Sequence, residues 1–463
     1  MVQAFNQAWR RFWRDRRGAA AAMVAIAAIP LAGFIGIATD ASRGYLMKSR
    51  LGEALDAAAL AGGRVVFSPH FEDDVEMYFE ANLPSDYLGA TITGPTINVD
   101  ANGEIITLTA SAELPATFMS LFGHDKMTVS ARTVVQRSVR GMELALVMDN
   151  TGSMSSNDKI GTMKAAAKDL VNILYGERET VPDFWVSLVP YSASVNIGAA
   201  HQDWLTGFDA GAYSPTTWKG CVEARTAPLD QTDDPPGDGF YWTPYLFPVD
   251  SDNAWPPVRE ENFWGNDGTG PNLGCGPAVT PLTAEKSGVI AAIDEMQAWS
   301  RGGTLTNLGL VWGWRAISPR WRGLWGGGTP ANLPLDYGTP LMDKVVVILT
   351  DGVNQMFDKP PAGPDGSDYT AYGRVGWGRL GVTTQGAALD EVNDRMAALC
   401  TDIKAQGVIL YTITFQLSNT RTQNLFRNCA TSDEHYFNSP NNADLQAAFR
   451  EIGTKLSQLR LRE

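Results

Sequence analysis

Two carboxylates and three hydroxyls are the side chains of this sequence whose types and spacing best suit chemistry. The stretch VMDNTGSMSS ends an apolar run in Asp149 and then offers hydroxyls at Thr151 and Ser153. A second apolar run, VVVILTDG, ends in Asp351, and GGTLTNLGL, which lies between the two runs, carries Thr304. Oxygen ligands of these types suit Mg²⁺, because this hard cation prefers octahedral oxygen coordination and keeps some of its waters. The five side chains therefore predict a site for Mg²⁺ or Mn²⁺.

The elements that must position these side chains alternate between strands and helices. MELALVM is apolar except for Glu143, and DKVVVILTDG has the apolar centre VVVIL, as strands buried on both faces have. Helical patterns such as KIGTMKAAAKDLVNILYG separate the strands. This alternation predicts an α/β domain with a doubly wound, mostly parallel sheet of Rossmann-like type. Ligands of such sheets bind beyond the carboxyl ends of the strands, so we expect the five side chains to converge at that edge.

The order of the three motifs, D-x-[ST]-x-S, G-G-T and T-D-G, resembles that of the von Willebrand factor A (vWA) domain over about Gly141 to Leu461. The resemblance implies a metal-ion-dependent adhesion site. Thr151 and Ser153 would bind the metal directly, the two aspartates would often act through water, and Thr304 would close the site. Thr306 is an alternative to Thr304, since it follows two residues later. The resemblance also implies that an Asp or Glu of a protein ligand completes the coordination.

Other functions fit the same residues less well. A haloacid-dehalogenase phosphatase needs a second aspartate where this chain has Thr151, and a serine hydrolase needs a G-x-S-x-G motif that TGSMS does not supply. We therefore expect a binding and scaffolding protein and no enzyme. Three alternatives stay open: a helix cap without metal, a metal-dependent, phosphatase-like hydrolase that uses the same cation, and a structural protein with a vestigial site.

The N-terminus predicts a membrane anchor. Residues 19–39 carry no charged side chain, and about 20 apolar residues suffice to cross a bilayer as a helix. The arginines that precede this run predict a cytoplasmic N-terminus and a chain that lies mostly on the far side; they are Arg10, Arg11, Arg14, Arg16 and Arg17. A buried core helix or a cleaved signal peptide are the alternatives to a retained single-pass anchor.

The same region, about Arg10 to Gly63, resembles the start of TadG-like proteins of the Tad (Flp) pilus apparatus, through its RRG, its apolar helix and its DAAALAG segment. Related pseudopilins carry Glu where this chain has Met23, so we expect no cleavage after Gly18. The resemblance implies a place in the bacterial inner membrane, a periplasmic bulk and other Tad pilus components as partners.

These patterns together predict a division of the chain. The predicted parts are a basic N-terminus (1–18), a transmembrane helix (19–39), a TadE/TadG-like helix with a small, pilin-like α+β region (40–140), and a vWA domain (141–463) with inserts at about 196–283, 318–336 and 355–384. Within the α+β region, alternation of apolar and polar residues predicts strands over 104–114 and 126–138. A short helix is expected over 71–82.

The net charge and the cysteines indicate which partners and which cellular compartment suit the chain. The net charge of −14 argues against nucleic acid as a partner. An even number of cysteines in an exported domain indicates disulfides, and the sequential pairing, Cys221 with Cys275 and Cys400 with Cys429, keeps each bond within one region. Crossed pairings and free thiols are the alternatives.

Overall fold

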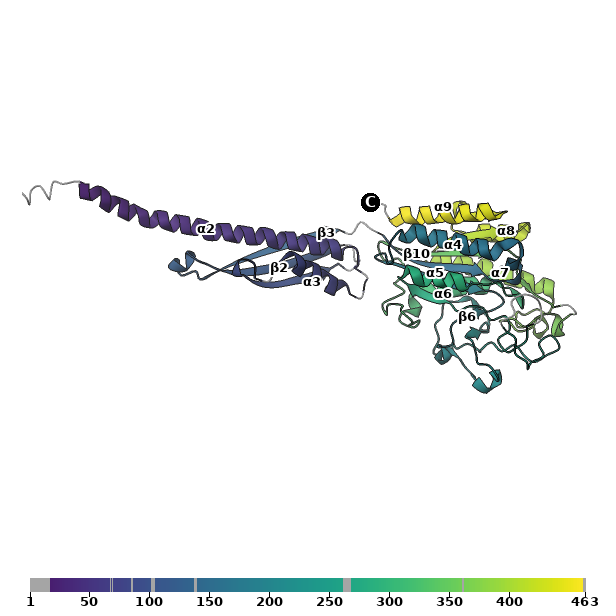
Figure 1. Cartoon of the computed structure of the whole chain (residues 1–463). Helices are drawn as coiled ribbons and strands as arrows, with labels where there is room; N and C mark the ends of the chain where they lie inside the picture. Colours follow the sequence, from purple (N-terminus) through teal and green to yellow (C-terminus); the bar gives the residue numbers. More distant parts are fainter. Residues whose placement is uncertain are drawn as a thin grey trace, which may run out of the picture. The chain divides into compact units, whose positions relative to one another are not determined.

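The computed structural model describes residues 17–66, 68, 70–84, 86–100, 105–136, 140–260, 268–359 and 362–460. The chain divides into two compact units, Met1–Arg137 and Ser138–Glu463 (Figure 1). The arginines at positions 10 to 16, from which a cytoplasmic N-terminus is predicted, lie outside the described residues.

One long helix organises the first unit. Helix α2 (Arg17–Gly62) runs without interruption through Pro30, so the predicted transmembrane helix and the predicted TadE/TadG-like helix after it are one element. From Met23 onward this helix is long and apolar enough to cross a membrane. Its buried positions recur every three or four residues, as one face of a helix does; they include Gly36, Asp40, Gly44, Met47 and Leu51.

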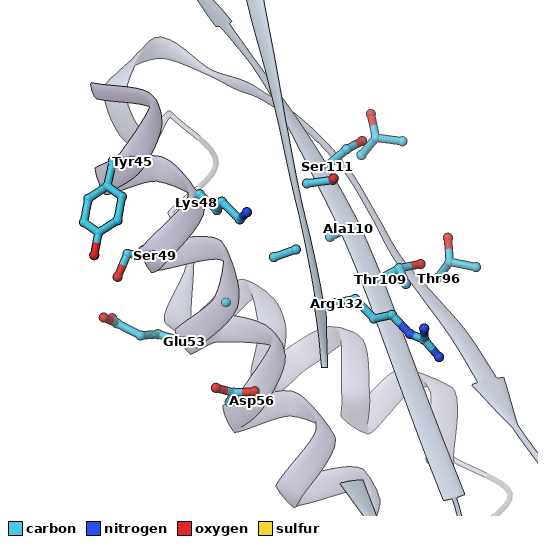
Figure 2. A pocket seen from close by; sticks show the side chains of 14 residues that line it. Tyr45, Lys48, Ser49, Glu53, Asp56, Thr96, Thr109, Ala110, Ser111 and Arg132 are labelled. Carbon is cyan, nitrogen blue, oxygen red and sulfur yellow. The ribbon is translucent and has the colours of Figure 1, made fainter. Parts of the chain in front are cut away.

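A small antiparallel sheet packs on that face of α2. Its strands β1 (Thr91–Val99), β2 (Ile105–Pro115) and β3 (Lys126–Gln136) lie in the order β1-β2-β3, and helix α3 (Phe71–Asn82) packs on α2 as well. Alternate residues of β2 are buried against the helices, among them Ile106, Leu108 and Leu114. Thr109 and Ser111, which alternate with them, line an open hollow beside α2 together with Ser49 and Glu53 (Figure 2).

The second unit is built on a six-stranded sheet of order β13-β12-β10-β4-β5-β8. Five strands are parallel: β4 (Gly141–Asp149), β5 (Phe184–Tyr191), β10 (Met342–Thr350), β12 (Ile409–Phe415) and β13 (Tyr436–Ser439). The edge strand β8 (Thr280–Thr283) is antiparallel to β5. The predicted doubly wound sheet is thus confirmed for the parallel strands, whereas the sheet as a whole is mixed, because the chain returns from its first insert antiparallel to β5.

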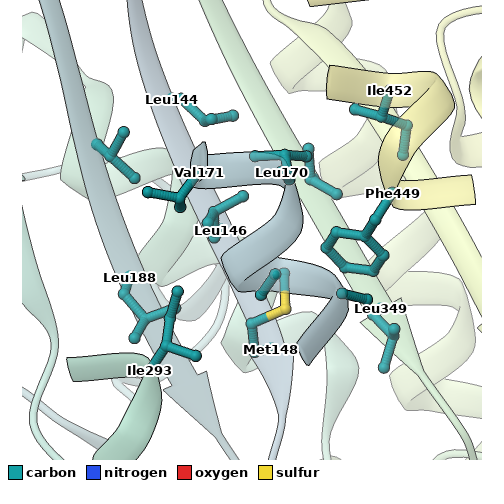
Figure 3. Packing of buried hydrophobic residues seen from close by; sticks show 14 of the residues in the cluster. Leu144, Leu146, Met148, Leu170, Val171, Leu188, Ile293, Leu349, Phe449 and Ile452 are labelled. Atoms are coloured by element: carbon teal, nitrogen blue, oxygen red, sulfur yellow. The ribbon is translucent and has the colours of Figure 1, made fainter. Parts of the chain in front are cut away.

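Helices cover both faces of this sheet. Leu144, Leu146 and Met148 of β4 point into a core with α4 (Lys159–Tyr175), α5 (Lys286–Glu295) and α9 (Asn442–Arg460), as Figure 3 shows. Val147, which points to the opposite face, meets helix α6 (Thr306–Ile317) at Gly313. Helices α7 (Gln385–Ala405) and α8 (Thr420–Cys429) complete the set. Short strand pairs join the inserts to the domain: β6 (Val195–Asn196) with β7 (Cys221–Val222), and β9 (Gly303–Thr304) with β11 (Gln355–Met356).

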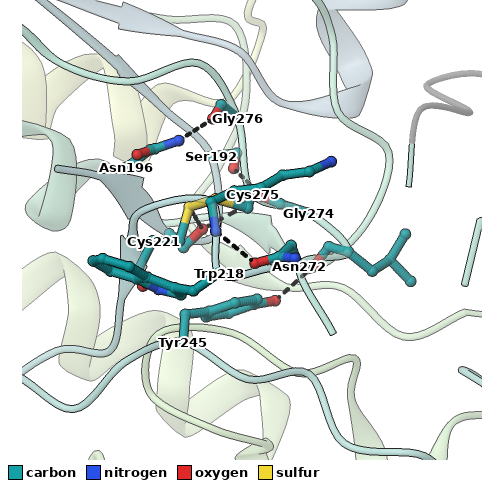
Figure 4. The surroundings of a disulfide bond; sticks show 12 residues. Ser192, Asn196, Trp218, Cys221, Tyr245, Asn272, Gly274, Cys275 and Gly276 are labelled. Carbon is teal, nitrogen blue, oxygen red and sulfur yellow. Dashed lines mark hydrogen bonds between the residues drawn. A yellow bond between two sulfur atoms is a disulfide. The ribbon is translucent and has the colours of Figure 1, made fainter. Parts of the chain in front are cut away.

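Several tryptophans of the inserts are buried. Trp204 of the first insert and Trp321 of the second have ring centroids 5.2 Å apart, and both rings are buried. The Cys221–Cys275 disulfide ties the first insert together beside the buried Tyr245 (Figure 4). The second disulfide joins Cys400 of α7 to Cys429 of α8. Both bonds follow the sequential pairing.

Candidate metal site

Two neighbouring parallel strands end in the carboxylates of the candidate site. Strand β4 pairs with β10 in register Val147 with Ile348, so Asp149 at the end of β4 and Asp351 directly after β10 lie at the same edge of the sheet. Both aspartates are buried. Parallel pairing thus brings together two acidic residues that are far apart in sequence.

Asp149 is fixed by hydrogen bonds on both carboxylate oxygens. Its Oδ1 accepts a bond of 2.8 Å from the backbone N–H of Thr151, and its Oδ2 accepts one of 2.8 Å from the hydroxyl of Thr350. The hydroxyl of Tyr191 lies 3.3 Å from the same Oδ2. Burial is the main cause, and the negative charge of Asp351 the second cause, that raises the pKa of Asp149 to about 7. A cation at this edge would therefore reduce the cost of holding two buried negative charges close together.

The first two hydroxyls have the spacing that one small cation requires. The Oγ1 of Thr151 lies 3.1 Å from the Oγ of Ser153, which in turn donates a hydrogen bond of 2.5 Å to the Oδ1 of Asp351. Adjacent oxygen ligands of an octahedral Mg²⁺, each at 2.0–2.1 Å from the ion, lie about 3 Å apart. The donor set and its spacing therefore fit the cation that the sequence predicts.

Thr304 lies at the same place, whereas the alternative residue Thr306 is engaged elsewhere. A methyl group added at Gly352 would lie 3.6 Å from the Oγ1 of Thr304 and 3.7 Å from the Oγ of Ser153, so both hydroxyls face this glycine. The hydroxyl of Thr306 instead donates to the Oδ1 of Asn354 at 2.7 Å. The geometry thus favours Thr304 as the third hydroxyl.

Three further residues belong to the site and are not predicted from the sequence. Lys159, at the start of α4, places its Nζ 2.8 Å from the Oδ2 of Asp351, and both groups are buried. Thr350 and Tyr191 support Asp149, as described above. Of the three, Thr350 could have been recognised from the sequence, because it directly precedes Asp351. Lys159 and Tyr191 lie near the site only because the chain folds back on itself.

The site is rich in hydroxyls, and its titratable side chains are two carboxylates, one lysine and one tyrosine. In the part of the chain that the structure describes, no three side chains of His, Cys, Asp or Glu come together as metal ligands. A cation here would rely on the neutral oxygens of Thr151, Ser153 and Thr304. The two buried carboxylates beside them, Asp149 and Asp351, would compensate part of the charge of the ion.

Comparison with known proteins identifies the N-terminal segment. Residues 18–65 match a family model described as Tad, putative Flp pilus-assembly TadE/G-like. This segment is TadE/G-like. The match confirms the resemblance of the N-terminus to the Tad pilus apparatus, and the TadE/G-like segment corresponds to α2 and the turn after it.

No curated protein matches the chain. Solved structures similar to it include the vWF domain of the type V pili tip protein Mfa5 from Porphyromonas gingivalis, at 9% identity and a TM-score of 0.37, with 70% of this chain and 98% of that chain covered. The pilus adhesin SpaC from Lactobacillus rhamnosus GG is 11% identical with a TM-score of 0.35, and the match covers 81% of this chain and 35% of that one. The PilB minor pilin from Streptococcus sanguinis is 12% identical with a TM-score of 0.33, and the match covers 81% of this chain and 80% of that one.

Proposed function

We propose that this protein is a membrane-anchored scaffold of Tad (Flp) pilus assembly or surface attachment that captures a protein ligand through a divalent cation. The ligands of Mg²⁺ or Mn²⁺ would be Thr151, Ser153 and Thr304, with Asp149 and Asp351 acting directly or through water. When bound, the cation supplies an open coordination position for an Asp or Glu carboxylate of the ligand protein. The TadE/G-like segment supports the pilus context.

The observation that carries the metal proposal is the 3.1 Å separation of the Thr151 and Ser153 hydroxyls beside two buried carboxylates. The chain's own residues prepare this arrangement. The backbone N–H of Thr151 and the hydroxyl of Thr350 orient Asp149, while Ser153 donates to Asp351. Because these bonds hold the oxygens in place, little ordering remains to be done when the ion arrives.

The proposed location is the bacterial inner membrane, with the N-terminus in the cytoplasm and the bulk of the chain in the periplasm. The apolar length of α2 supports a single span, and the preceding arginines support this orientation. The two disulfides agree with an oxidising compartment for the second unit. We propose no enzymatic activity, since the site offers its carboxylates to a cation and no histidine joins them among the described residues.

Calorimetric titration of the detergent-solubilised full chain with Mg²⁺ tests the proposal. We expect saturable binding by the natural protein and none by Asp149→Ala, with circular dichroism showing that the variant is folded. Equal affinity in both proteins would mean that Asp149 only caps the turn that follows it. An acidic peptide added to the Mg²⁺-loaded protein should bind, and chelation of the cation should release it.

A further inference from the structure

The tip of the β2–β3 hairpin exposes apolar side chains beside the apolar part of α2. The tip contains the short helix η2 (Met119–Phe122), and here Leu121 is 81% exposed and Phe122 is 60% exposed. Phe118, just before η2, is 39% exposed. Large apolar side chains that cluster on a surface are typical of sites that contact another protein or a membrane.

The tip lies directly against the helix. A side-chain carbon added at Gly36 would come 2.6 Å from the Cβ of Phe118, and one added at Gly33 would come 3.4 Å from the ring of Phe122. Both glycines lie within the uncharged run 19–39. Because glycine has no side chain, the hairpin tip can pack closely on α2 at these two positions. The tip therefore extends beyond Asp40 and lies along the apolar surface of the helix.

Asp40 fixes the tip at this level. Its carboxylate accepts hydrogen bonds from the backbone N–H groups of Thr117, Phe118 and Met119 at 3.1, 2.8 and 2.8 Å. The guanidinium of Arg43 donates to the Thr117 hydroxyl at 2.7 Å. These bonds satisfy backbone groups that would be costly to leave unpaired near hydrocarbon, and they make the tip part of the helix surface.

The depth of the tip follows from the geometry of the helix. Gly33 precedes Asp40 by seven residues, which is about 10 Å along the axis of an α-helix. Apolar groups of interfacial elements are buried about 5–10 Å into the boundary between headgroups and acyl chains. If the first charged residue after the span, Asp40, marks the membrane surface, the ring of Phe122 lies at the inner limit of this zone.

We propose that the hairpin tip, through Phe118, Leu121 and Phe122, inserts into the same bilayer that α2 spans, on the side of Asp40. This proposal rests on the proposed membrane anchor and is independent of the metal site. The bilayer is the occupant because the apolar surface is continuous: Phe34 and Ile35, next to the glycine that meets Phe122, are 71% and 67% exposed. The medium that covers these helix residues also surrounds the tip at the same level.

Fluorophores attached at single cysteines test the proposal in the full chain, reconstituted in lipid nanodiscs and kept oxidised so that the disulfides do not react. An environment-sensitive dye is placed at Leu121→Cys, at Ile29→Cys in the span and at Ser130→Cys on an exposed position of β3. Lipids that carry a nitroxide near the headgroup or near the acyl-chain end report the depth. We expect blue-shifted emission and quenching by the shallow nitroxide at Leu121→Cys, quenching by the deep nitroxide at Ile29→Cys, and neither effect at Ser130→Cys.

The three dye positions distinguish a failure of the proposed tip insertion from a failure of the proposed membrane anchor. No quenching at Leu121→Cys together with quenching at Ile29→Cys would overturn the proposal and leave the anchor intact. In that case, a blue shift at Leu121→Cys without quenching by any lipid would indicate that protein covers the tip. No quenching at either site would show that α2 does not span the bilayer, which would contradict the proposed anchor itself.

Discussion

The Nζ of Lys159 lies 2.8 Å from the Oδ2 of Asp351, within a site whose other acidic residue, Asp149, lies at the end of the neighbouring strand. One buried lysine therefore already compensates one of the two buried carboxylates. A divalent cation at the proposed site would bind with this positive charge close by. The lysine would thus limit how tightly the proposed site holds a metal ion.

Replacement of Lys159 by methionine should tighten Mg²⁺ binding roughly tenfold. A unit charge about 5 Å from a divalent ion interacts with it by about 7 kcal/mol at an effective dielectric constant of 20, and relaxation, salt and the loss of compensation at Asp351 reduce the net effect on binding. Calorimetry on Lys159→Met measures the change. Lys168→Met is the matched control, because Lys168 lies on the same helix but pairs with the more exposed Asp294 at 2.7 Å. Weaker binding in Lys159→Met would show instead that the lysine is needed to orient Asp351.

The first hydroxyl of the site should depend on its oxygen and not on its shape. Thr151→Ser keeps the hydroxyl 3.1 Å from that of Ser153 and should bind Mg²⁺ with nearly natural affinity. Thr151→Val keeps the shape without the oxygen and should lose about tenfold or more, since even residues that support a ligand indirectly cost this much. Calorimetric titration of both variants decides the point, and similar affinities would exclude Thr151 as a ligand.

The contribution of Asp149 to the stability of the metal-free protein should fall as the pH rises from about 4 to about 7. Burial raises the pKa of Asp149 from 3.8 to about 7 in the folded chain. Below pH 4 the carboxyl is protonated in both states. Between pH 4 and 7 the unfolded chain releases the proton while the folded chain keeps it, so the free energy of unfolding falls, and above pH 7 this contribution is constant.

Urea unfolding in the presence of a chelator, repeated across this pH range, measures the effect of Asp149. Asp149→Asn, which keeps an oxygen acceptor for the Thr151 N–H, should remove this part of the pH dependence. A profile that is identical in the variant would assign the slope to other groups. Saturating Mg²⁺ should raise the stability of the natural protein most at pH 7 and above, where the carboxylate is charged.

The two disulfides should each stabilise the second unit by up to about 4 kcal/mol, since they close chain segments of 54 and 29 residues. Double variants Cys221→Ser with Cys275→Ser and Cys400→Ser with Cys429→Ser separate the two contributions in urea unfolding. Peptide mapping without reductant should recover only the two sequential pairs from the natural protein. Crossed pairs in that map would contradict the structure.

The sequence predicts those features that depend on local patterns. The carboxylates and hydroxyls of the site are recognisable because each one follows an apolar strand or precedes a helix, and the apolar length of α2 is a local property too. Lys159 is not predictable in this way, because its partner lies 192 residues further along the chain and only the parallel pairing brings the two together.

Other features of the fold that the sequence did not predict also have specific physical reasons. Strand β1 carries Gly94 and Pro95 at an irregularity of its pairing with β2, which interrupts the alternation that identifies a strand. The antiparallel direction of β8 depends on how the first insert returns to the sheet, and no residue within Thr280–Thr283 encodes that path. The place of the hairpin tip beside Gly33 and Gly36 likewise depends on the packing of β2 and β3 on α2.

Helix α2 is a single element of 46 residues that carries both the apolar segment and the surface on which the small sheet packs. At 1.5 Å per residue it is a rod of about 70 Å. No hinge separates the segment proposed to span the bilayer from the one that holds β2 and β3. A tilt or rotation of the helix in the membrane would therefore be passed on undiminished to the sheet outside. A force applied to the sheet would in the same way be transmitted along α2 to the segment proposed to span the bilayer.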